Sequence, residues 1–362
     1  MAKRLLCIIS SLNTGGAETF LMKLYRGLDK SKYQMDFVVS ADGFYDKEVE
    51  ALGGKIYKIP LRTKHPIKTY RLIKKIVKDN KYNSVLKLGN SPLSVIDLIA
   101  AKKGGAKIRA MRSCNALTNL SFKQKLVDFI FRPKLNRCAN VKIAPSDLAA
   151  IYTFGEKQYS KGKVHLLNNG VDLDVYRYDQ EERQRIRTEF SLGDNLIVGH
   201  IGRFSKQKNH KFLLPIFAEI KKKNNNAKLM LVGKGELESE IRNQAAELGI
   251  LDDIIFTGVR SDVPALLSAM DVFVFPSFHE GMPNTVIEAQ ATGLPCVIAD
   301  TITKSANITG LVEYLPLTLS SEEWAEHALS SVSSIRVGVK EAFIKQHYDI
   351  NSVIIDFVSL MF

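Results

Sequence analysis

Two glutamates eight residues apart form the first pair in this sequence whose types and spacing could do chemistry. Glu280 and Glu288 lie in FHEGMPNTVIEAQATGLP, residues 278–295, and a glycine and a proline follow soon after the first glutamate. Pro283 suits a first helical position, where the N–H that proline lacks would have no partner. The pattern therefore predicts a helix over 285–292.

The start of this helix would be a natural anion site. The apolar run DVFVFPS, residues 271–277, precedes it, so the order is strand, loop, helix. Free N–H groups and the helix dipole attract negative charge, and Gly281 lets a ligand approach the backbone. Glu280 could cap the helix or contact a ligand hydroxyl, and Glu288 could be an ordinary surface residue. Gly293 is expected to end the helix in a left-handed conformation.

A second pair of candidate residues follows the strand in GHIGRFSKQKNHKFLL. Arg203 offers a forked pair of donors and Lys208 a point charge, a combination suited to holding a diphosphate. Both follow the carboxyl end of a strand, where open α/β sheets bind ligands. Asn209 is expected to cap the next helix, which would begin near His210. The alternative is that both cations are simply solvated.

Glycine turns supply further candidates for binding phosphate or a base. Gly15 and Gly16 stand between the first strand and a helix, where a glycine pair lets backbone N–H groups approach phosphate. Gly258, Val259 and Arg260 follow another strand, and their backbone could meet a nucleobase. Either stretch could also be a plain turn, and neither has the GxGxxG or GxxxxGK[ST] pattern.

The sequence contains no pattern that indicates a metal site. Asp172 and Asp174 form a DxD, which could hold a divalent metal, but we interpret them as turn-forming residues. The histidines form no HxH or HExxH. The cysteines show no CxxC, and we interpret them as reduced cytosolic thiols: Cys7, Cys114, Cys138 and Cys296.

Strand-like apolar runs alternate with helix-length segments along the whole chain, which predicts parallel sheets covered by helices. The alternation occurs twice, on either side of an irregular polar stretch at 168–176. We therefore expect two doubly wound α/β domains. The predicted boundaries are 1–170, joined by a C-terminal helix at 345–362, and 171–344. Asn351 could cap the last helix.

Length and composition fit a two-domain globular protein: 362 residues, 45% hydrophobic and 25% charged. No apolar run approaches the roughly 20 residues that span a bilayer, and the apolar core at Leu5–Ile9 is too short for a signal peptide. Residues 1–170 contain 32 Lys and Arg against 12 Asp and Glu, whereas 171–362 contain 19 against 26. The basic half predicts an anionic partner, such as membrane lipid, nucleic acid or a phosphorylated substrate, or else a solvated basic face.

Taken in order, these motifs resemble the retaining, GT-B-type glycosyltransferases of family 4, also called group 1. EGMPNTVIEAQATGLP is similar to the family's E-x7-E signature, and IGRFSKQKN to its G-R-x-x-x-x-K segment. SLNTGGAE resembles its N-terminal glycine loop, NNGVDLDVY its interdomain joint, and HYDI the segment where the chain returns to the first domain. The resemblance implies two Rossmann-like domains that face each other across a cleft.

The resemblance also implies roles for the candidate residues. Arg203 and Lys208 would bind the donor diphosphate, Glu288 the ribose hydroxyls, and Glu280 the donor sugar. Charge left on the nucleoside diphosphate would be stabilised by preorganised donors, without a metal or a resident cofactor. The remaining donor-side positions are Gly15, Gly16, Gly258, Val259, Arg260, Gly281, Met282, Pro283 and Asn284.

The acceptor side departs from the family pattern. Many relatives carry histidines near the strand in KIRAMRSCNA, whereas Arg112 and Cys114 stand there in this chain. Asn90, Arg112 and Asn115 are the candidates for this side. The resemblance implies that the departing phosphate itself could deprotonate the acceptor hydroxyl.

The expected activity is retaining transfer of a hexose or N-acetylhexosamine from a nucleotide sugar, UDP-linked, to a lipid-linked saccharide of capsule, exopolysaccharide or O-antigen. Segments 68–81 and 121–137 mix basic and apolar residues, as interfacial helices do, or as helices packed on a sheet with a basic outer face do. We expect a cytoplasmic protein that is peripheral on the inner face of the membrane. The alternatives are an epimerase or phosphorylase of similar fold and, from another class, a nucleic-acid-binding protein, for which no motif is evident.

Overall fold

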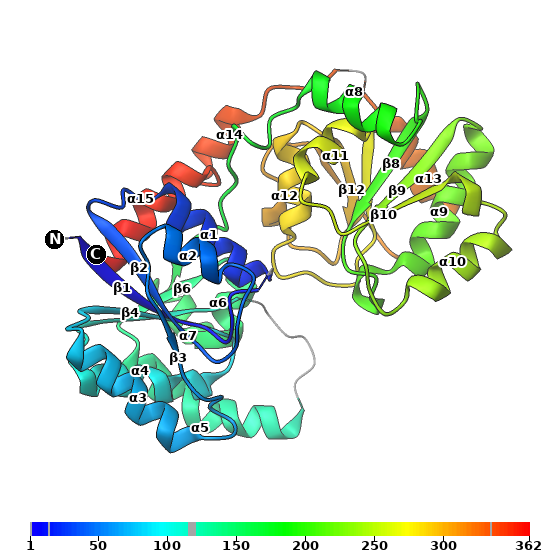
Figure 1. Ribbon diagram of the computed structural model, residues 1–362. Coiled ribbons are helices and arrows are strands. Elements are labelled where there is room, and N and C mark those ends of the chain that lie inside the picture. The colour runs from blue at the N-terminus through cyan, green and yellow to red at the C-terminus, as the bar shows by residue number, and fades with distance from the viewer. Residues whose placement is uncertain (1, 14, 115–120, 334) are drawn as a thin grey trace. The chain divides into compact units, whose positions relative to one another are not determined.

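The computed structural model describes residues 2–13, 15–114, 121–333 and 335–362, and α/β units follow one another along the chain (Figure 1). The chain forms two compact units, one made of Met1–Gly170 with His347–Phe362 and the other of Val171–Gln346. Each unit has its own parallel sheet. The predicted α/β class is therefore confirmed.

The sheet of the first unit has seven strands in the part of the chain that is described, in the order β3-β2-β1-β4-β5-β6-β7, and all its pairings are parallel. Its central strands are buried on both faces, which explains why they are almost continuously apolar. The sequence did not predict β7, which has two exposed residues. The strands are β1 (Lys3–Ile8), β2 (Tyr33–Val39), β3 (Ile56–Lys58), β4 (Ser84–Leu88), β5 (Ile108–Arg112), β6 (Val141–Ala144) and β7 (His165–Leu166).

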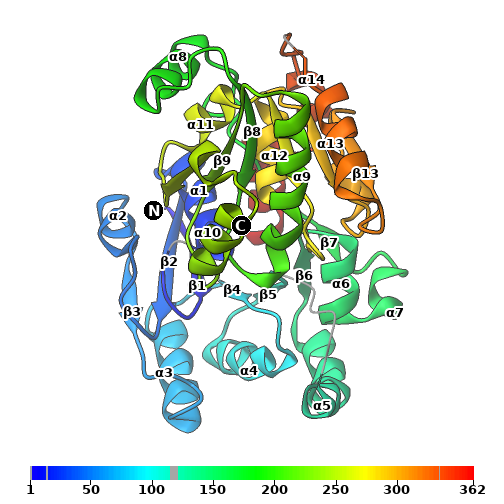
Figure 2. The ribbon, with the colours of Figure 1, turned by 90° about the vertical axis from the view of Figure 1, so that its right-hand side faces the viewer.

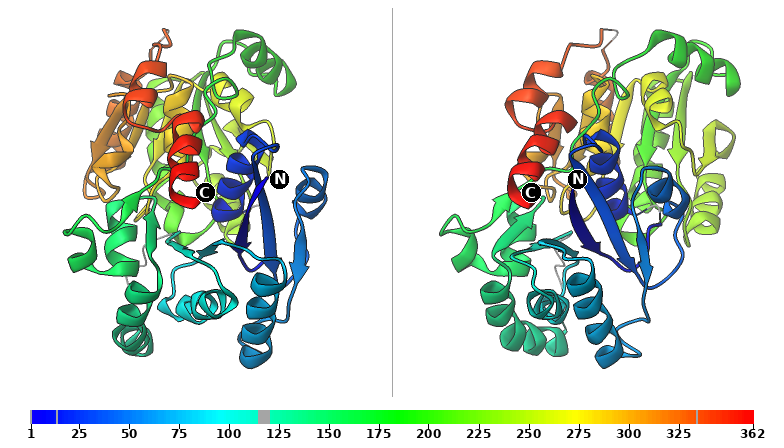
Figure 3. Two further views of the ribbon diagram at one scale, coloured as in Figure 1. Left: turned by 90° about the vertical axis from the view of Figure 1, so that its left-hand side faces the viewer. Right: turned by 60° about the vertical axis from the view of Figure 1, so that its left-hand side comes forward.

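Helices cover both faces of this sheet. Figure 3 shows α15 beside α1 on one face, and Figure 2 shows α3, α4 and α5 together on the other. No helix among the described residues is long and apolar enough to cross a bilayer. The helices are α1 (Gly16–Gly27), α2 (Asp46–Ala51), α3 (Pro66–Asp79), η1 (Pro92–Ser94), α4 (Val95–Gly104), α5 (Phe122–Cys138), α6 (Asp147–Phe154), α7 (Glu156–Tyr159) and α15 (Ile350–Met361).

The second unit has a six-stranded parallel sheet over its described residues, in the order β10-β9-β8-β11-β12-β13. The edge strand β13 was missed by the sequence analysis because two of its four residues are only partly buried and polar or aromatic. The strands are β8 (Leu196–Ile201), β9 (Ala227–Val232), β10 (Ile254–Gly258), β11 (Val272–Phe275), β12 (Cys296–Ala299) and β13 (Val312–Leu315). The helices are α8 (Gln180–Glu189), η2 (Lys206–Lys208), α9 (His210–Lys223), α10 (Glu238–Glu247), η3 (Leu251–Asp253), α11 (Val263–Ala269), α12 (Asn284–Ala291), η4 (Lys304–Ala306), α13 (Ser321–Ser330) and α14 (Lys340–Lys345).

The last helix begins at a cap that differs from the predicted one. The side chain of Asp349 accepts hydrogen bonds from the N–H groups of Asn351 and Ser352. The prediction that Asn351 caps the helix is wrong, because the helix starts two residues earlier than a cap at Asn351 would require. Val353 and Phe357 then bury one face of α15 in the first unit's core.

The strand order reverses once in each sheet, and this reversal fixes where ligand groups can gather. In the first sheet the reversal falls between β1 and β4, and in the second between β8 and β11. Loops that leave two such neighbouring strands run in opposite directions, so a crevice opens between them at the carboxyl edge. The residues predicted to do chemistry follow β8 and β11.

Candidate functional site

A largely buried ion pair joins the loops that leave β8 and β11. The ammonium Nζ of Lys208, at the end of η2, lies 2.7 Å from Oε1 of Glu280, and the two side chains are 16% and 11% exposed. The same Nζ lies 4.6 Å from the ring centroid of Phe275. The structure therefore brings together two predicted site residues in a charge-assisted hydrogen bond supported by a cation–π contact.

Three further hydrogen bonds hold these two loops together. The N–H of Phe278 donates to the carbonyl of Gln207 at 2.9 Å, and Gln207 Nε2 donates to the carbonyl of His279 at 2.8 Å. Asn209 Nδ2 donates to the carbonyl of Pro276 at 3.0 Å, and its backbone is left-handed, with φ of 55°. Asn209 is the N-cap residue of α9 as predicted, but its side chain does not cap the helix, because its amide bridges to the neighbouring loop instead. Lys208 therefore lies on a loop that these hydrogen bonds fix to the neighbouring loop.

Two buried histidines lie beneath Lys208. The rings of His200 and His210 are 4.7 Å apart, and His200 Nδ1 lies 2.9 Å from the carbonyl oxygen of Val274. Burial lowers the pKa of His200 well below its usual range and that of His210 to about 4, and the charge on Lys208 lowers both further. Both rings are therefore neutral at neutral pH, and Lys208 supplies the positive charge at this position. The sequence analysis did not single out this pair.

Arg203 lies in the same loop but does not join the ion pair. Its side chain is 73% exposed, and its NH2 lies 3.0 Å from Oε2 of Glu236. The loop of Glu236 packs closely here: a Cβ on Gly233, which has φ of 137°, would lie 2.1 Å from the carbonyl oxygen of Gly202. The glycine at 233 thus serves the contact between two loops. Arg203 is an accessible cation beside the crevice.

The helix α12 begins directly after the Glu280 loop. Asn284 is its first residue and Pro283 its N-cap, with φ of −79° and ψ of 90°. The prediction that Pro283 is the first helical residue is wrong by one position, because its ψ is extended. Gly281 and Met282 connect Glu280 to this helix start, and Gly293, with φ of 68°, follows its end as expected. The positive end of the helix dipole lies at this start and favours negative charge close to it.

Glu288, one turn further along α12, is held by a residue that the sequence analysis did not propose as a site residue. The hydroxyl of Tyr176 hydrogen-bonds to the Glu288 carboxylate, and burial, followed by the negative charge of that carboxylate, raises the pKa of Tyr176 well above its usual range. Tyr176 therefore stays protonated and donates. No spacing rule links position 176 to position 288, so the sequence carried no signal for this contact.

The DxD motif forms the turn that precedes Tyr176. The Asp172 carboxylate accepts hydrogen bonds from the N–H groups of Asp174 at 3.1 Å and Val175 at 3.3 Å. The N–H of Tyr176 donates to the carbonyl of Asp172 at 2.9 Å. The interpretation of Asp172 and Asp174 as turn residues is therefore confirmed.

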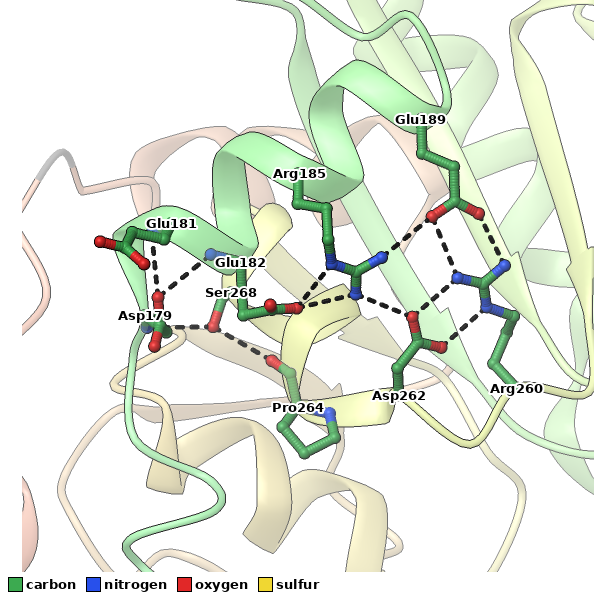
Figure 4. Close-up of polar contacts among 9 residues, drawn as sticks. All are labelled: Asp179, Glu181, Glu182, Arg185, Glu189, Arg260, Asp262, Pro264 and Ser268. Carbon is green, nitrogen blue, oxygen red and sulfur yellow. Dashed lines mark hydrogen bonds and ion pairs between the residues drawn. The ribbon is translucent and has the colours of Figure 1, made fainter.

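Arg260 belongs to an ion-pair network that ties α8 to the start of α11 (Figure 4). Its guanidinium makes paired contacts of 2.8 and 2.7 Å to Asp262 and of 2.7 and 3.1 Å to Glu189. The hydrogen bond from Arg260 holds the pKa of Asp262 well below its usual range. The side chain is thus engaged within the unit. Gly258, with φ of 71°, and Val259, which is 76% exposed, remain accessible next to it.

In the first unit, Gly15 and Gly16 stand at the predicted strand-to-helix turn. Gly16 is the first residue of α1 and Gly15 its N-cap, with φ of −91°. A Cβ on Gly15 would lie 2.3 Å from a carboxylate oxygen of Glu18. A carboxylate from the first turn of α1 therefore lies at the start of this helix, where negative charge interacts favourably with the helix dipole.

The acceptor-side candidates lie around β5. Arg112 is 1% exposed, its guanidinium stacks 3.6 Å from the ring centroid of Phe20, and its NH2 donates to Asn169 Oδ1 at 2.6 Å. Burial lowers its pKa to about 10. In this structure the side chain packs inside the unit, and the assignment of Arg112 to the acceptor side stays a prediction. Asn90 Oδ1 accepts from the N–H of Cys114 at 2.8 Å, and Asn115 lies outside the described residues.

Comparison with protein families matches both parts of the chain. Residues 14–175 match the model of Glycosyltransferase Family 4, and residues 195–332 match that of Glycosyl transferases group 1. Among curated relatives, "Putative glycosyltransferase EpsF" of Bacillus subtilis (strain 168) is 34% identical over 95% of this chain and 91% of that protein.

Two other similarities bear on the fold and the chemistry. "UDP-Gal:alpha-D-GlcNAc-diphosphoundecaprenol alpha-1,3-galactosyltransferase" of Escherichia coli is 28% identical over 65% of this chain and 61% of its own length. Among solved structures, Anabaena Alr3699/HepE in complex with UDP aligns with a TM-score of 0.79 at 19% identity, over 99% of this chain and 98% of that one. The structural likeness shows that both chains share the GT-B fold.

Proposed function

Because this chain belongs to the family 4, or group 1, glycosyltransferases, we propose that it moves a hexose or N-acetylhexosamine from a UDP-sugar to a lipid-linked saccharide, with retention at the anomeric carbon. The acceptor would be an intermediate of a cell-surface polysaccharide, such as capsule or O-antigen. In this proposal the second unit binds the donor and the first unit the acceptor. The name of the Escherichia coli relative, with UDP-Gal and a diphosphoundecaprenol acceptor, supports this choice of substrates.

The observation that carries the proposal is the Lys208–Glu280 pair directly ahead of the start of α12. Transfer breaks the bond between the anomeric carbon and a phosphate oxygen and leaves negative charge on the nucleoside diphosphate. An ammonium on a loop held in place by hydrogen bonds, and the positive end of a helix dipole, are preorganised to stabilise that charge. We therefore propose that departure of the diphosphate needs no metal, and that its oxygen takes the proton of the acceptor hydroxyl.

The other donor-side residues then have distinct tasks. Glu288, oriented by Tyr176, would accept hydrogen bonds from the ribose hydroxyls. Glu280 and the backbone at Gly281–Asn284 would hold the donor sugar. The accessible backbone at Gly258 and Val259 would meet the base. Arg203 is free to leave Glu236 for a diphosphate, because exposed ion pairs contribute little stability.

Turnover of a nucleotide-sugar panel tests the activity. We expect thermal stabilisation by UDP above that by GDP or ADP, and transfer from one UDP-sugar to a GlcNAc-diphospholipid, with an α-linkage in the product seen by NMR. Conversion of the UDP-sugar to an epimer without acceptor would contradict transfer. Absence of turnover with every donor would contradict the proposal as a whole.

We further propose that the first unit docks on anionic membrane through one face of α5, which we call the α5 face. It consists of Leu126, Phe129, Ile130, Lys134 and Arg137. Phe129 is 81% exposed, and Leu126 and Ile130 lie three residues before it and one after it, on the same side of the helix. Apolar side chains edged by cations are the composition of an interfacial helix.

The basic outer face of α3 lies on the same side of the first sheet as α5 (Figure 2). Its cations are Lys68, Arg71, Lys74, Lys75 and Lys78, all exposed, while Ile73 and Val77 pack into the core. The structure therefore supports the second interpretation of this segment, a helix packed on its sheet with a basic outer face. We propose that this face also meets the anionic membrane. Each cation near an anionic surface contributes about 1 kcal/mol.

Replacing Phe129 and Ile130 together by glutamine is expected to weaken binding to phosphatidylglycerol vesicles by at least about tenfold, since a buried large apolar side chain contributes about 1.5–3 kcal/mol. Co-sedimentation measures the effect. Phe44→Gln is the matched control, because Phe44 is 72% exposed in the same unit but lies outside the α5 face. Equal binding of the wild type to neutral phosphatidylcholine vesicles would contradict the docking proposal.

A further inference from the structure

A cavity of about 160 Å³ lies in the first unit at the carboxyl ends of β1, β2 and β4. We call it the Lys87 pocket. Its lining includes Ser10, Ser40, Arg62, Lys87 and Asp97, together with further threonine and apolar side chains. Because the strand order of this sheet reverses between β1 and β4, the cavity occupies the position at which open α/β sheets bind ligands.

Charged side chains meet at the wall of this pocket. Lys87 comes from β4 and Asp97 from the first turn of α4, and they are 8% and 3% exposed. Oδ2 of Asp97 lies 3.4 Å from Lys87 Nζ and 2.8 Å from NH1 of Arg62. The other oxygen, Oδ1, is buried and has no hydrogen-bond partner among the described residues. The cluster therefore has unused capacity both to donate and to accept hydrogen bonds.

A buried cluster of charged side chains contributes little to the stability of a protein core. Burial lowers the pKa of Lys87 in spite of the neighbouring Asp97 carboxylate, which shows that desolvation outweighs the attraction. Replacing a buried ion pair by apolar residues is often neutral or stabilising, whereas an unpartnered buried carboxylate oxygen costs free energy. The arrangement is better explained by a ligand that completes the hydrogen bonds.

The donors and acceptors on the wall restrict what that ligand can be. Asp97 Oδ1 requires a donor and repels an anion, while Lys87 and Arg62 require acceptors and repel a cation. A hydroxyl group both donates and accepts, so a polyol satisfies all three residues. At about 30 Å³ for each water, the cavity has room for roughly five waters, which suits one sugar ring.

We propose that the Lys87 pocket binds the hydroxyl groups of the acceptor saccharide, with Asp97 accepting from one hydroxyl and Lys87 and Arg62 donating to its neighbours. The inference rests on the proposed glycosyl transfer for the identity of the saccharide as acceptor. Lys87 and Asp97 then select among acceptors by the positions of their hydroxyls, because a misplaced hydroxyl leaves a buried charge unpaired.

The test uses a variant that removes the two most deeply buried charges together, so that only Arg62, whose side chain is 28% exposed, keeps its charge. Lys87→Met with Asp97→Leu keeps side-chain volume near that of the pair, and it is expected to fold with a melting temperature equal to or above the wild type. Lys102→Met is the matched control, because Lys102 is exposed on the same helix. The probes are the methyl glycosides of glucose, galactose and N-acetylglucosamine, observed by saturation-transfer NMR.

At least one methyl glycoside is expected to bind the wild type and the control, and to lose about ten- to hundredfold in affinity in the double variant, as expected for hydrogen bonds to charged groups. If the double variant does not fold, Lys87→Gln with Asp97→Asn gives a second comparison, because it also removes both buried charges and keeps polar side chains of similar shape. Thermal stabilisation by UDP is measured in parallel and is expected to be unchanged.

Two results would overturn the assignment. One is equal binding of the glycosides to the wild type and the double variant, which would leave a purely structural ion pair. The other is inorganic phosphate, in place of any glycoside, stabilising the wild type but not the double variant. The proposed function would be contradicted by a different result, the absence of turnover with every nucleotide-sugar donor. The two failures are therefore distinguishable.

Discussion

Replacing Lys208 by methionine is expected to lower kcat for glycosyl transfer by about 10²–10³-fold, the effect of removing one preorganised donor from a developing negative charge. Methionine retains an apolar stem over Phe275, so packing changes little. The ammonium is 16% exposed and the histidines beneath it are neutral, so few solvent molecules or other cations replace its charge. Initial rates at saturating donor and acceptor measure the change.

The matched control for this prediction is Lys206→Met. Lys206 begins η2, in the same loop, and is exposed, so the substitution removes the same charge two residues away. Its kcat is expected to stay within about threefold of the wild type, as for an exposed charge. Lys208→Met also leaves the Glu280 carboxylate without its cation. Comparison with Glu280→Gln, which removes the carboxylate charge instead, separates that effect from the loss of the ammonium itself. A Lys208→Met rate near that of the wild type would remove the ammonium from the mechanism.

Arg203→Ala distinguishes the two cations that the sequence placed together. In the structure the Arg203 side chain is 73% exposed and pairs with Glu236. Solvent and ions therefore screen the attraction between Arg203 and the diphosphate until the substrate binds. We expect turnover to fall here as well, but less than in the Lys208 variant, because the Lys208 ammonium is already held at the crevice. A loss equal to that of Lys208→Met would show that Arg203 closes fully onto the diphosphate.

The fold was predictable because parallel strands covered on both faces must be continuously apolar. The run of β11 carries that pattern without interruption, and the runs of β1 and β8 carry it along most of their length. β7 was not predicted because its two residues are exposed. β13 was not predicted because it is an edge strand in which buried apolar residues flank partly buried polar and aromatic ones. The cap of α15 was misplaced by two residues, since Asp349 and Asn351 are both good caps and only the backbone decides between them.

Much less of the candidate site could be predicted. Arg, Lys and Glu at strand ends indicated anion chemistry, yet nothing in their spacing showed that Lys208 contacts Glu280 while Arg203 contacts Glu236. These partners are set by which loops the strand order brings side by side. The sequence likewise did not show that Arg112, at the end of β5, is buried against a neighbouring aromatic ring and Asn169.

Glu288→Ala is expected to raise KM for the nucleotide-sugar donor by about 10²–10⁴-fold, with a smaller change in kcat. A carboxylate that accepts from two ribose hydroxyls makes charge-assisted hydrogen bonds, which contribute about 1.5–3 kcal/mol each. The ribose does not react, so the contribution is nearly equal in ground state and transition state, and it appears in KM. Donor titration at saturating acceptor measures KM, and Glu247→Ala, on the exposed face of α10, is the control.

Tyr176→Phe tests how the carboxylate is held. The Tyr176 hydroxyl is protonated and donates to Glu288, so its removal leaves the carboxylate charged but free to turn. We expect KM for the donor to rise about tenfold or less, in the direction of Glu288→Ala. In the double variant Tyr176→Phe with Glu288→Ala, the tyrosine change should add nothing, because an orienting residue has no effect once the group that it orients is absent. Additive effects would instead mean that Tyr176 contacts the donor by itself.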